Sequence, residues 1–592
     1  MSQEKRALIA VGLCLLVLLG WPAIMNRFGK KPTAAVTTSA SSSASLPSQA
    51  AAVDDKARAL AAAAPSAVGA PAQQPAAVVP EQRVSIEHKG RYRVELTNYG
   101  AGLTKFELLD RKYFSRDKYR HRLVLPPGSR EPVQERSQGD GPTNLLGSYR
   151  PAFAVRFPSS GFALPETQVF TLASDETLPD GARKLAYVLE TAELRILKTY
   201  LFPAQSYEIG LSVELQNKKT TPVSYHLELS LEGYQDPSQK PGSVFSEKVP
   251  QTELLWDVAG KRRSLALEPL LDGKADADDL RGNLRWIGFG SQYFLLAAAL
   301  PYGAQIGDKQ GKAKADPNGA LTASAEFSEQ TLQPGQSVTL PIAIYGGPKL
   351  PELLDVVTVG GQPAGLKTAI DYTLEVIARP LLWILRQLYH LVHNWALAIV
   401  LLTGLVKLLT LWPSYKSMQS MKAMGKLKPQ IDALKVKCGD DQQRFNTEMM
   451  ALYKKHGVNP VGGCLPILIQ MPIYFALYSM LGNAVELYRV RLGWIPDLTA
   501  SDPYFVLPLA TGALMFLQTK LSPASPDPQQ KMMANLMPIM FTVFSIFLPA
   551  GLTVYIMTNT ILGMAQQSYM NRDSGGKDAP QPVPVAVTKR KR

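Results

Sequence analysis

The sequence has 592 residues, 46% of them hydrophobic, and a formal net charge of +14 at pH 7, so it is long enough for two or more folded units. Its only cysteines are Cys14, Cys438 and Cys464, which excludes a disulfide framework and a cysteine-rich metal site. The basic residues gather beside apolar tracts. Cytoplasmic loops of membrane proteins have this pattern, which explains the charge without a specific nucleic-acid partner.

The first apolar tract covers residues 7–25, which are 19 residues without a charge. At about 1.5 Å per residue, this tract nearly crosses a hydrocarbon core of roughly 30 Å. We therefore predict an N-terminal membrane span within residues 1–30. A cleavable signal peptide is the alternative, but the small residues Ala34 and Ala35 lie well past the apolar run. Residues 31–80 are mostly Ala, Ser, Pro and Thr, a composition that predicts a disordered linker.

Residues 81–350 show the period of two that is typical of strands, for example at Ile209, Leu211, Val213 and Leu215. A second alternating run begins at Val223, and the six residues 217–222 between the two runs predict a hairpin connection. Many short runs of this kind, separated by Gly, Pro and Asp, indicate a large antiparallel β-sandwich. The region has no metal-spaced or catalytic constellation in its sequence.

The last third of the chain alternates apolar tracts with basic connections. Residues 366–394 have apolar positions three and four apart, which predicts an amphipathic helix at the membrane interface. Residues 395–413 form a predicted second span, and residues 460–571 contain four more, with Pro549, Ala550 and Gly551 reversing the chain between the last two. The fold class is thus a polytopic α-helical membrane protein with six spans and a large antiparallel β-sandwich domain.

Charge predicts the topology. Residues 414–458 have nine basic and four acidic residues, and the tail 572–592 has six basic and two acidic residues. Both are therefore expected in the cytoplasm, which places both termini in the cytoplasm and the β-domain on the other side of the membrane. Arg27, Lys30 and Lys31 after the first span disagree with this orientation, but the later loops outweigh them.

Residues 414–459 predict a cytoplasmic helical hairpin with a turn at Gly439 and an N-cap at Asp440 or Asp441. Its basic start indicates contact with anionic lipids, and a docking surface for the ribosome or an incoming chain is a compatible alternative. Fifteen of the seventeen methionines follow residue 417. Clustered methionines suit a surface that accepts many apolar sequences, although packing between helices explains such residues equally well.

Lys407 is a charged residue within the predicted second span. A charge at the centre of a span costs roughly 2.5 to 3.5 kcal/mol on insertion scales, so its presence needs a reason. Its side chain either extends to the interface or contributes to a wet cavity with other polar residues of the spans. The candidate residues of such a cavity are Lys407, Thr403, Gln470, Gln518, Tyr555 and Asn559.

Three long motifs resemble one family. Residues 459–478 (NPVGGCLPILIQMPIYFALY), 527–544 (DPQQKMMANLMPIMFTVF) and 548–567 (LPAGLTVYIMTNTILGMAQQ) are similar to the YidC family of membrane insertases. The resemblance implies a protein that inserts and folds integral membrane proteins, alone or beside the Sec translocon. It also implies an outer domain of the galactose-mutarotase sandwich type and a hydrophilic groove whose key arginine is here Lys407. The lysine keeps the charge but lacks the bidentate geometry of arginine.

Two other functions remain as alternatives. A secondary transporter could use Lys407 at a solute site, although the two halves of the chain show no repeat. A membrane-anchored sugar-binding protein could use the β-domain. We expect no enzymatic activity, no catalytic residue, no metal site and no cofactor.

Overall fold

The computed structural model describes residues 79–573, except 89, 116–118, 125–132, 139–140, 163, 165–167, 240–250, 272–280, 302–307, 440, 459–464 and 522–527. The predicted first span, nearly all of the predicted linker and the basic tail beyond residue 573 lie outside the described residues.

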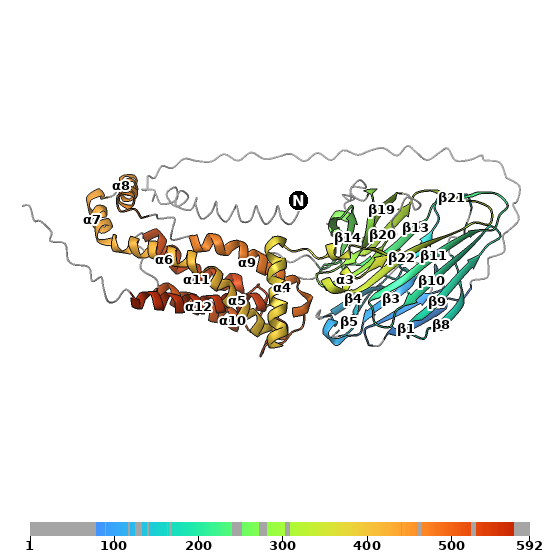
Figure 1. Ribbon diagram of the computed structural model, residues 1–592, viewed down its shortest axis with the longest axis horizontal. Coiled ribbons are helices and arrows are strands. Elements are labelled where there is room, and N and C mark those ends of the chain that lie inside the picture. The colour runs from blue at the N-terminus through green and yellow to red at the C-terminus, as the bar shows by residue number, and fades with distance from the viewer. Residues whose placement is uncertain are drawn as a thin grey trace, which may run out of the picture. The chain divides into compact units, whose positions relative to one another are not determined.

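Three sheets of four or more strands make up the β-domain (Figure 1). The nine-stranded sheet has the order β15-β14-β17-β18-β22-β11-β10-β9-β8, the five-stranded sheet β16-β19-β20-β13-β7, and the four-stranded sheet β1-β2-β3-β6. Every ladder in these sheets is antiparallel, as the alternating runs predict. The sheet-rich part of the sequence prediction is therefore confirmed.

The strands of the nine-stranded sheet are Thr171–Thr177 (β8), Arg183–Glu190 (β9), Leu194–Phe202 (β10), Glu208–Asn217 (β11), Glu253–Val258 (β14), Lys261–Leu265 (β15), Leu284–Gly290 (β17), Phe294–Ala299 (β18) and Ser337–Pro348 (β22). The other two sheets contain Arg83–His88 (β1), Tyr92–Thr97 (β2), Leu103–Leu108 (β3), Thr143–Asn144 (β6), Ala154–Arg156 (β7), Glu228–Tyr234 (β13), Arg281–Gly282 (β16), Lys309–Ala315 (β19) and Ala320–Phe327 (β20). Short two-stranded pairs are formed by Tyr119–Val124 (β4) with Val133–Gln138 (β5), Val223–Tyr225 (β12) with Gln330–Leu332 (β21), and Thr358–Val359 (β23) with Gln362–Pro363 (β24).

The hairpin predicted at residues 217–222 is wrong. β11 ends at Asn217 and pairs with β10 and β22, whereas β12 begins at Val223 and pairs with β21. The Asn217 amide donates hydrogen bonds to the carbonyls of Thr221 and Leu332, so the connection is fixed between two sheets. Alternation places side chains on faces but does not choose the neighbouring strand.

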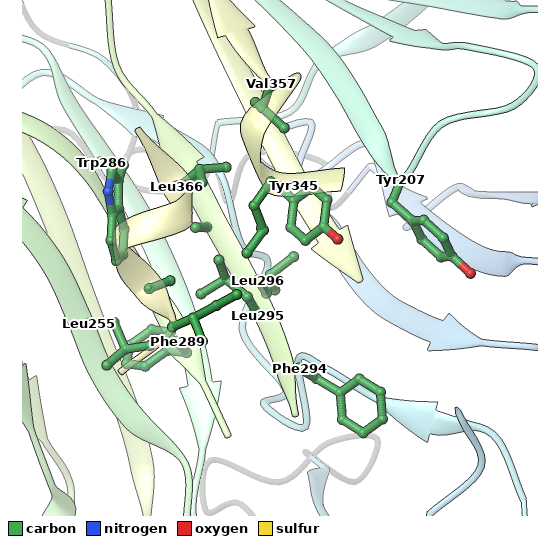
Figure 2. Close-up of a cluster of buried hydrophobic side chains, with 14 of the residues drawn as sticks. Tyr207, Leu255, Trp286, Phe289, Phe294, Leu295, Leu296, Tyr345, Val357 and Leu366 are labelled. Atoms are coloured by element: carbon green, nitrogen blue, oxygen red, sulfur yellow. The ribbon is translucent and has the colours of Figure 1, made fainter. Parts of the chain in front are cut away.

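Apolar side chains from several strands form the core of the β-domain (Figure 2). Figure 2 shows Trp286 and Phe289 of β17 near Leu295 and Leu296 of β18. Trp286 is completely buried, and its indole nitrogen donates to the Thr368 hydroxyl. Burying an aromatic side chain of this size stabilises a fold by several times the contribution of one hydrogen bond, so no disulfide is needed here.

One side of the five-stranded sheet buries a carboxyl group. Glu232 of β13 is 1% exposed and accepts a hydrogen bond of 3.0 Å from the Thr322 hydroxyl. Burial raises the pKa of Glu232 from 4.5 to about 7, although Thr322 and the nearby cation of Arg150 oppose the rise. The folded state therefore holds this proton more tightly than the unfolded state does.

This difference predicts the pH dependence of stability. The contribution of Glu232 is fully present below its ordinary pKa of 4.5 and is lost as the pH rises to about 7. Glu232→Gln is therefore expected to flatten the fall in unfolding temperature over this pH window. The β-sheet signal in circular dichroism of the detergent-solubilised chain measures it, with Glu176→Gln at an exposed position as the control. An unchanged slope in Glu232→Gln would contradict the assignment.

Two short helices lie among the strands, Leu267–Leu271 (α2) and Pro351–Asp355 (α3). The other described α-helices follow the last strand and are Glu375–Val392 (α4), Trp395–Leu409 (α5), Leu411–Lys426 (α6), Lys428–Cys438 (α7), Gln442–Lys455 (α8), Leu465–Asn483 (α9), Val506–Leu521 (α10), Pro528–Ser545 (α11) and Ala550–Asp573 (α12). Helices α5, α9, α10, α11 and α12 run beside one another, and α4 runs across their direction (Figure 1).

A helix that crosses a membrane alone must be both long and apolar. Among the described residues, no single helix is long and apolar enough, but α5 and α6 meet the requirement together, with a bend of 60° between them. Helix α10 and residues 534–545 of α11 are shorter apolar helices. Proline lies inside α9 and α11, at Pro472 and Pro538. The number of spans therefore remains a prediction.

The predicted helical hairpin is formed by α7 and α8. Ile431 of α7 and Phe445 of α8 are buried in one small cluster, against which Leu434, Met449 and Leu452 pack. Gly439 caps α7 with a φ of +56°, a value that glycine adopts without strain. The Asp441 carboxylate accepts a hydrogen bond from the Arg444 backbone N–H and caps α8. The core and the Asp441 cap both match the sequence prediction.

The connection between α9 and α10 contacts the β-domain through buried side chains. The Tyr488 ring lies 4.8 Å from the Tyr293 ring and 5.5 Å from the Phe294 ring, centroid to centroid. The Tyr488 hydroxyl donates to the Phe114 carbonyl at 2.9 Å, and the Tyr293 hydroxyl donates to the Gly482 carbonyl at the end of α9. These contacts attach the outer end of α9 to the sheets.

Candidate functional site

Polar residues of the apolar helices follow one face of α12. Tyr555, Asn559 and Gly563 are spaced four residues apart, so they lie above one another on one side of the helix. Helices α5, α9 and α10 all contact α12. The three positions, together with the side chains from other helices that meet them, are called the α12 stripe below.

The first part of the α12 stripe joins α12 to α9. The Gln470 amide donates a hydrogen bond of 3.0 Å to the Tyr555 hydroxyl. The Asn559 amide donates one of 3.1 Å to the Tyr474 hydroxyl, and the two tyrosine rings meet edge to face at 5.9 Å between centroids. Four polar groups from two helices thus form a connected network.

Tyr474 was missed by the sequence prediction. It lies four residues after Gln470, so the two side chains occupy the same face of α9. That spacing was a usable signal, but a tyrosine in an apolar tract also fits ordinary packing.

The second part of the α12 stripe brings α5 and α10 to α12. A Cβ atom added to Gly563 would lie 2.9 Å from Nε2 of Gln518 and 3.4 Å from Nζ of Lys407. The ends of both side chains therefore lie over the backbone of Gly563. The structure brings together Lys407 and Gln518, as the hypothesis of a shared polar site requires.

Lys407 is not neutralised by a carboxylate of the neighbouring helices. Helices α5, α9, α10 and α11 contain no Asp or Glu, and the acidic residue of α12 is Asp573 at its last position. Asp573 lies ten residues beyond Gly563, or about 15 Å along the helix. Within the described part of these five helices, the positive charge of Lys407 therefore has no carboxylate counterion, and Glu375 of α4, which also packs on α5, is paired with Arg379.

Thr403 has a different environment from the other candidates. Its side chain is completely buried, and its hydroxyl donates a hydrogen bond of 2.7 Å to the Ile399 carbonyl within α5. This hydroxyl is used inside its own helix, as is common for threonine in apolar helices. Thr403 lies four residues before Lys407 on α5, but its side chain contributes to packing and its hydroxyl is already hydrogen-bonded within that helix.

Comparison with known proteins gives two family matches. Residues 387–577 match the model described as 60Kd inner membrane protein, and residues 142–384 match the model described as YidC periplasmic domain. A membrane protein insertase YidC from Anaeromyxobacter dehalogenans is 35% identical over 514 residues, which cover 85% of this chain and 87% of the relative. Another, from Nitrosococcus oceani, is 37% identical over 397 residues, covering 64% of this chain and 67% of the relative.

Two solved structures also align with this chain. A crystal structure of an active YidC insertase aligns with a TM-score of 0.36 and 17% identity, covering 83% of this chain and 93% of that one. A galactose mutarotase-like protein from Lactobacillus casei aligns with a TM-score of 0.26 and 11% identity, covering 45% of this chain and 100% of that one.

The family models and relatives define the class, which is an inner-membrane protein that inserts other proteins into the membrane. The chain belongs to the YidC family of membrane protein insertases. Its function is that of a membrane protein insertase, which is not enzymatic. The motif-based recognition of this family is therefore confirmed.

Proposed function

We propose that the α12 stripe is the path by which polar flanks of a client enter the membrane. The observation that carries this proposal is the positive charge of Lys407, which lies against Gly563 and Gln518 where the described residues of α5, α9, α10 and α11 include no carboxylate. The path continues along α12 through the network of Gln470, Tyr474, Tyr555 and Asn559. Positions four residues apart on the helix are about 6 Å apart along its axis.

Lys407 acts in this mechanism through charge and hydration. A cation in a partly hydrated site attracts acidic or polar flanks and shortens the low-dielectric distance that they cross. The amide and hydroxyl groups of the stripe then replace part of the hydration of those flanks. No covalent bond forms or breaks.

The apolar part of the client leaves toward lipid. Helices α10 and α11 expose Leu509, Phe516, Ile539 and Met540, which offer an apolar surface to an emerging helix. Met532 and Met537 are exposed on the same helix as Met540, and flexible thioethers adapt to clients of different shape. Burial of roughly 25 cal/mol per Å² drives the client out of the stripe into its final environment.

The proposed topology has six spans, with both termini in the cytoplasm and the β-domain in the periplasm. Residues 1–30 supply the first span, and residues 31–80 supply the linker to a domain that covers 81–350. The helix predicted at 366–394 lies at the interface, residues 395–413 and 460–571 supply the other spans, and 414–459 and 572–592 face the cytoplasm. The excess of basic residues in the last two segments supports this orientation.

Cysteine labelling tests this topology. Thr220, at an exposed position of the β-domain, and Gln430, exposed on α7, are each replaced with cysteine in a chain whose native cysteines are removed. The cysteine at 220 is expected to react with an impermeant thiol reagent in intact spheroplasts, and the one at 430 only after lysis. Reaction at 430 in intact spheroplasts would overturn the six-span arrangement.

The proposed partners are the ribosome, the Sec translocon and anionic lipids. The sequences of the α7–α8 hairpin and of the basic tail have an excess of positive charge. The phosphate groups of both ribosomal RNA and anionic lipids attract such a charge. Insertion of a simple client would need the chain alone, and insertion of larger clients would be shared with Sec.

Depletion followed by quantitative proteomics of the membrane fraction tests the function. Broad loss of integral membrane proteins, restored by the wild-type chain, is the expected result. Loss of the uptake of one solute with normal membrane-protein levels would instead indicate a transporter that uses Lys407. Loss of one glycan would indicate a function of the β-domain.

A further inference from the structure

Gly563 lies where three helices bring polar groups together. Lys407 approaches it from α5 and Gln518 from α10, while Gly563 itself is buried in the middle of α12. A Cβ atom at this position would be 3.4 Å from the ammonium nitrogen and 2.9 Å from the amide nitrogen. The first distance is an ordinary contact and the second is too short, so alanine must move the Gln518 amide, and only a side chain longer than alanine must also move the Lys407 ammonium.

The conformation of Gly563 does not require glycine. It lies within a continuous helix, and its φ is not among the positive values of the described glycines. Glycine is a poor helix former, so alanine would be preferred at this position if only the helix mattered. The missing side chain therefore provides space rather than conformational freedom.

Two other glycines within helices have surroundings that differ from those of Gly563. A Cβ atom at Gly404 of α5 would meet nothing within 4 Å, and one at Gly512 of α10 would overlap the side chain of Thr542 on α11. Gly512 thus permits close packing of two helices. At Gly563, in contrast, the atoms that fill the space are the ends of two flexible polar side chains.

We propose that Gly563 is a positioning residue that sets where the Lys407 ammonium lies, by leaving room for it against the backbone of α12. This inference rests on the proposed role of Lys407 in accepting acidic client flanks. A larger side chain at 563 would displace the ammonium along its flexible stem, away from the backbone of α12. The charge would remain in the protein but at the wrong place.

The test compares Gly563→Ala and Gly563→Leu with wild type and Lys407→Ala at matched protein levels. The quantity measured is the ratio of insertion of a client with an acidic N-terminal tail to that of the same client with a neutral tail, by protease protection. Gly404→Leu is the matched control, because it adds the same side chain to α5 where the structure leaves open space. Trypsin resistance of each purified variant reports its folding.

The expected ratio falls with the size of the side chain. Gly563→Ala should change it by less than about twofold, because its methyl group leaves the ammonium at an ordinary contact distance, whereas Gly563→Leu should lower it toward the level of Lys407→Ala, because displacing the ammonium lengthens the distance over which it attracts the tail. Trypsin resistance should stay the same or rise in Gly563→Ala, because alanine favours the helix. A purely structural role would lower both client types equally and leave the ratio unchanged.

Two results would overturn the inference, and they can be told apart. A wild-type ratio in both Gly563 variants, with a reduced ratio in Lys407→Ala, overturns the role of Gly563 alone. A wild-type ratio in Lys407→Ala overturns the role of the charge and the inference with it. If the leucine variant does not accumulate, Gly563→Val takes its place, because its side chain also extends beyond Cβ, where the ammonium lies 3.4 Å away.

Discussion

Replacing Lys407 with alanine is expected to lower insertion of a client with an acidic N-terminal tail by at least about tenfold. Opposite charges roughly 7 Å apart at an effective dielectric constant of about 20 attract by ~2 kcal/mol, and about 1.4 kcal/mol corresponds to tenfold. Lys407→Arg should retain insertion because it keeps the charge, and Lys407→Glu should impair it more than alanine because it repels the tail. Protease protection of the client at matched insertase levels measures all three.

A client with a neutral tail is the control for this series. Its insertion should change little in Lys407→Ala, because the tail has no charge for the lysine to attract. The alternative, in which Lys407 only extends to the interface, predicts that alanine is harmless or stabilising, since it removes a costly charge from an apolar helix. Equal insertion of both clients by wild type and Lys407→Ala would favour that alternative.

Replacing Tyr488 with alanine is expected to destabilise the attachment of α9 to the β-domain by about 3 to 5 kcal/mol, the usual cost of removing a buried aromatic ring. Tyr488 is 3% exposed, and its ring contacts Tyr293 and Phe294. The loss should appear as faster proteolysis of the connection between α9 and α10 in the purified full-length chain.

Tyr488→Phe separates the ring from its hydroxyl. It keeps both ring contacts and loses only the hydrogen bond to the Phe114 carbonyl, so a cost of about 1 kcal/mol is expected. Proteolysis of Tyr488→Ala at the wild-type rate would show that these contacts do not hold the segment. Insertion of a simple client should be reduced in Tyr488→Ala, because α9 presents Gln470 and Tyr474 to the stripe.

The β-domain illustrates what alternation of side chains predicts. The runs around Leu194 and Ile209 predicted β10 and β11 because every second side chain is buried in them. The same pattern wrongly predicted that β11 and the strand after it form a hairpin. β11 instead pairs with β22, which begins 120 residues after Asn217 at Ser337. Such long-range pairing depends on the packing of whole sheets, which periodicity does not describe.

The sequence predicted only part of the polar site. Lys407 and Gln518 stand out in the sequence because polar residues are rare in apolar helices. Gly563 and Tyr474 do not stand out, because glycine and tyrosine are frequent in such helices. Thr403 fits the predicted spacing, but its hydroxyl donates a hydrogen bond to a carbonyl of its own helix. Residue spacing does not predict which acceptor a hydroxyl uses.

The hydrogen bond between Lys422 and the Met570 carbonyl has a consequence for biosynthesis. Its length is 2.7 Å, and it joins the C-terminal part of α6 to the last turn of α12 across 148 residues. A chain made from its N-terminus exposes Lys422 long before Met570 exists, so this contact forms after almost all of the protein has been synthesised. Until then the base of the α7–α8 hairpin lacks one of its attachments. The hairpin therefore folds locally first and is fixed to the rest of the protein late, near chain release.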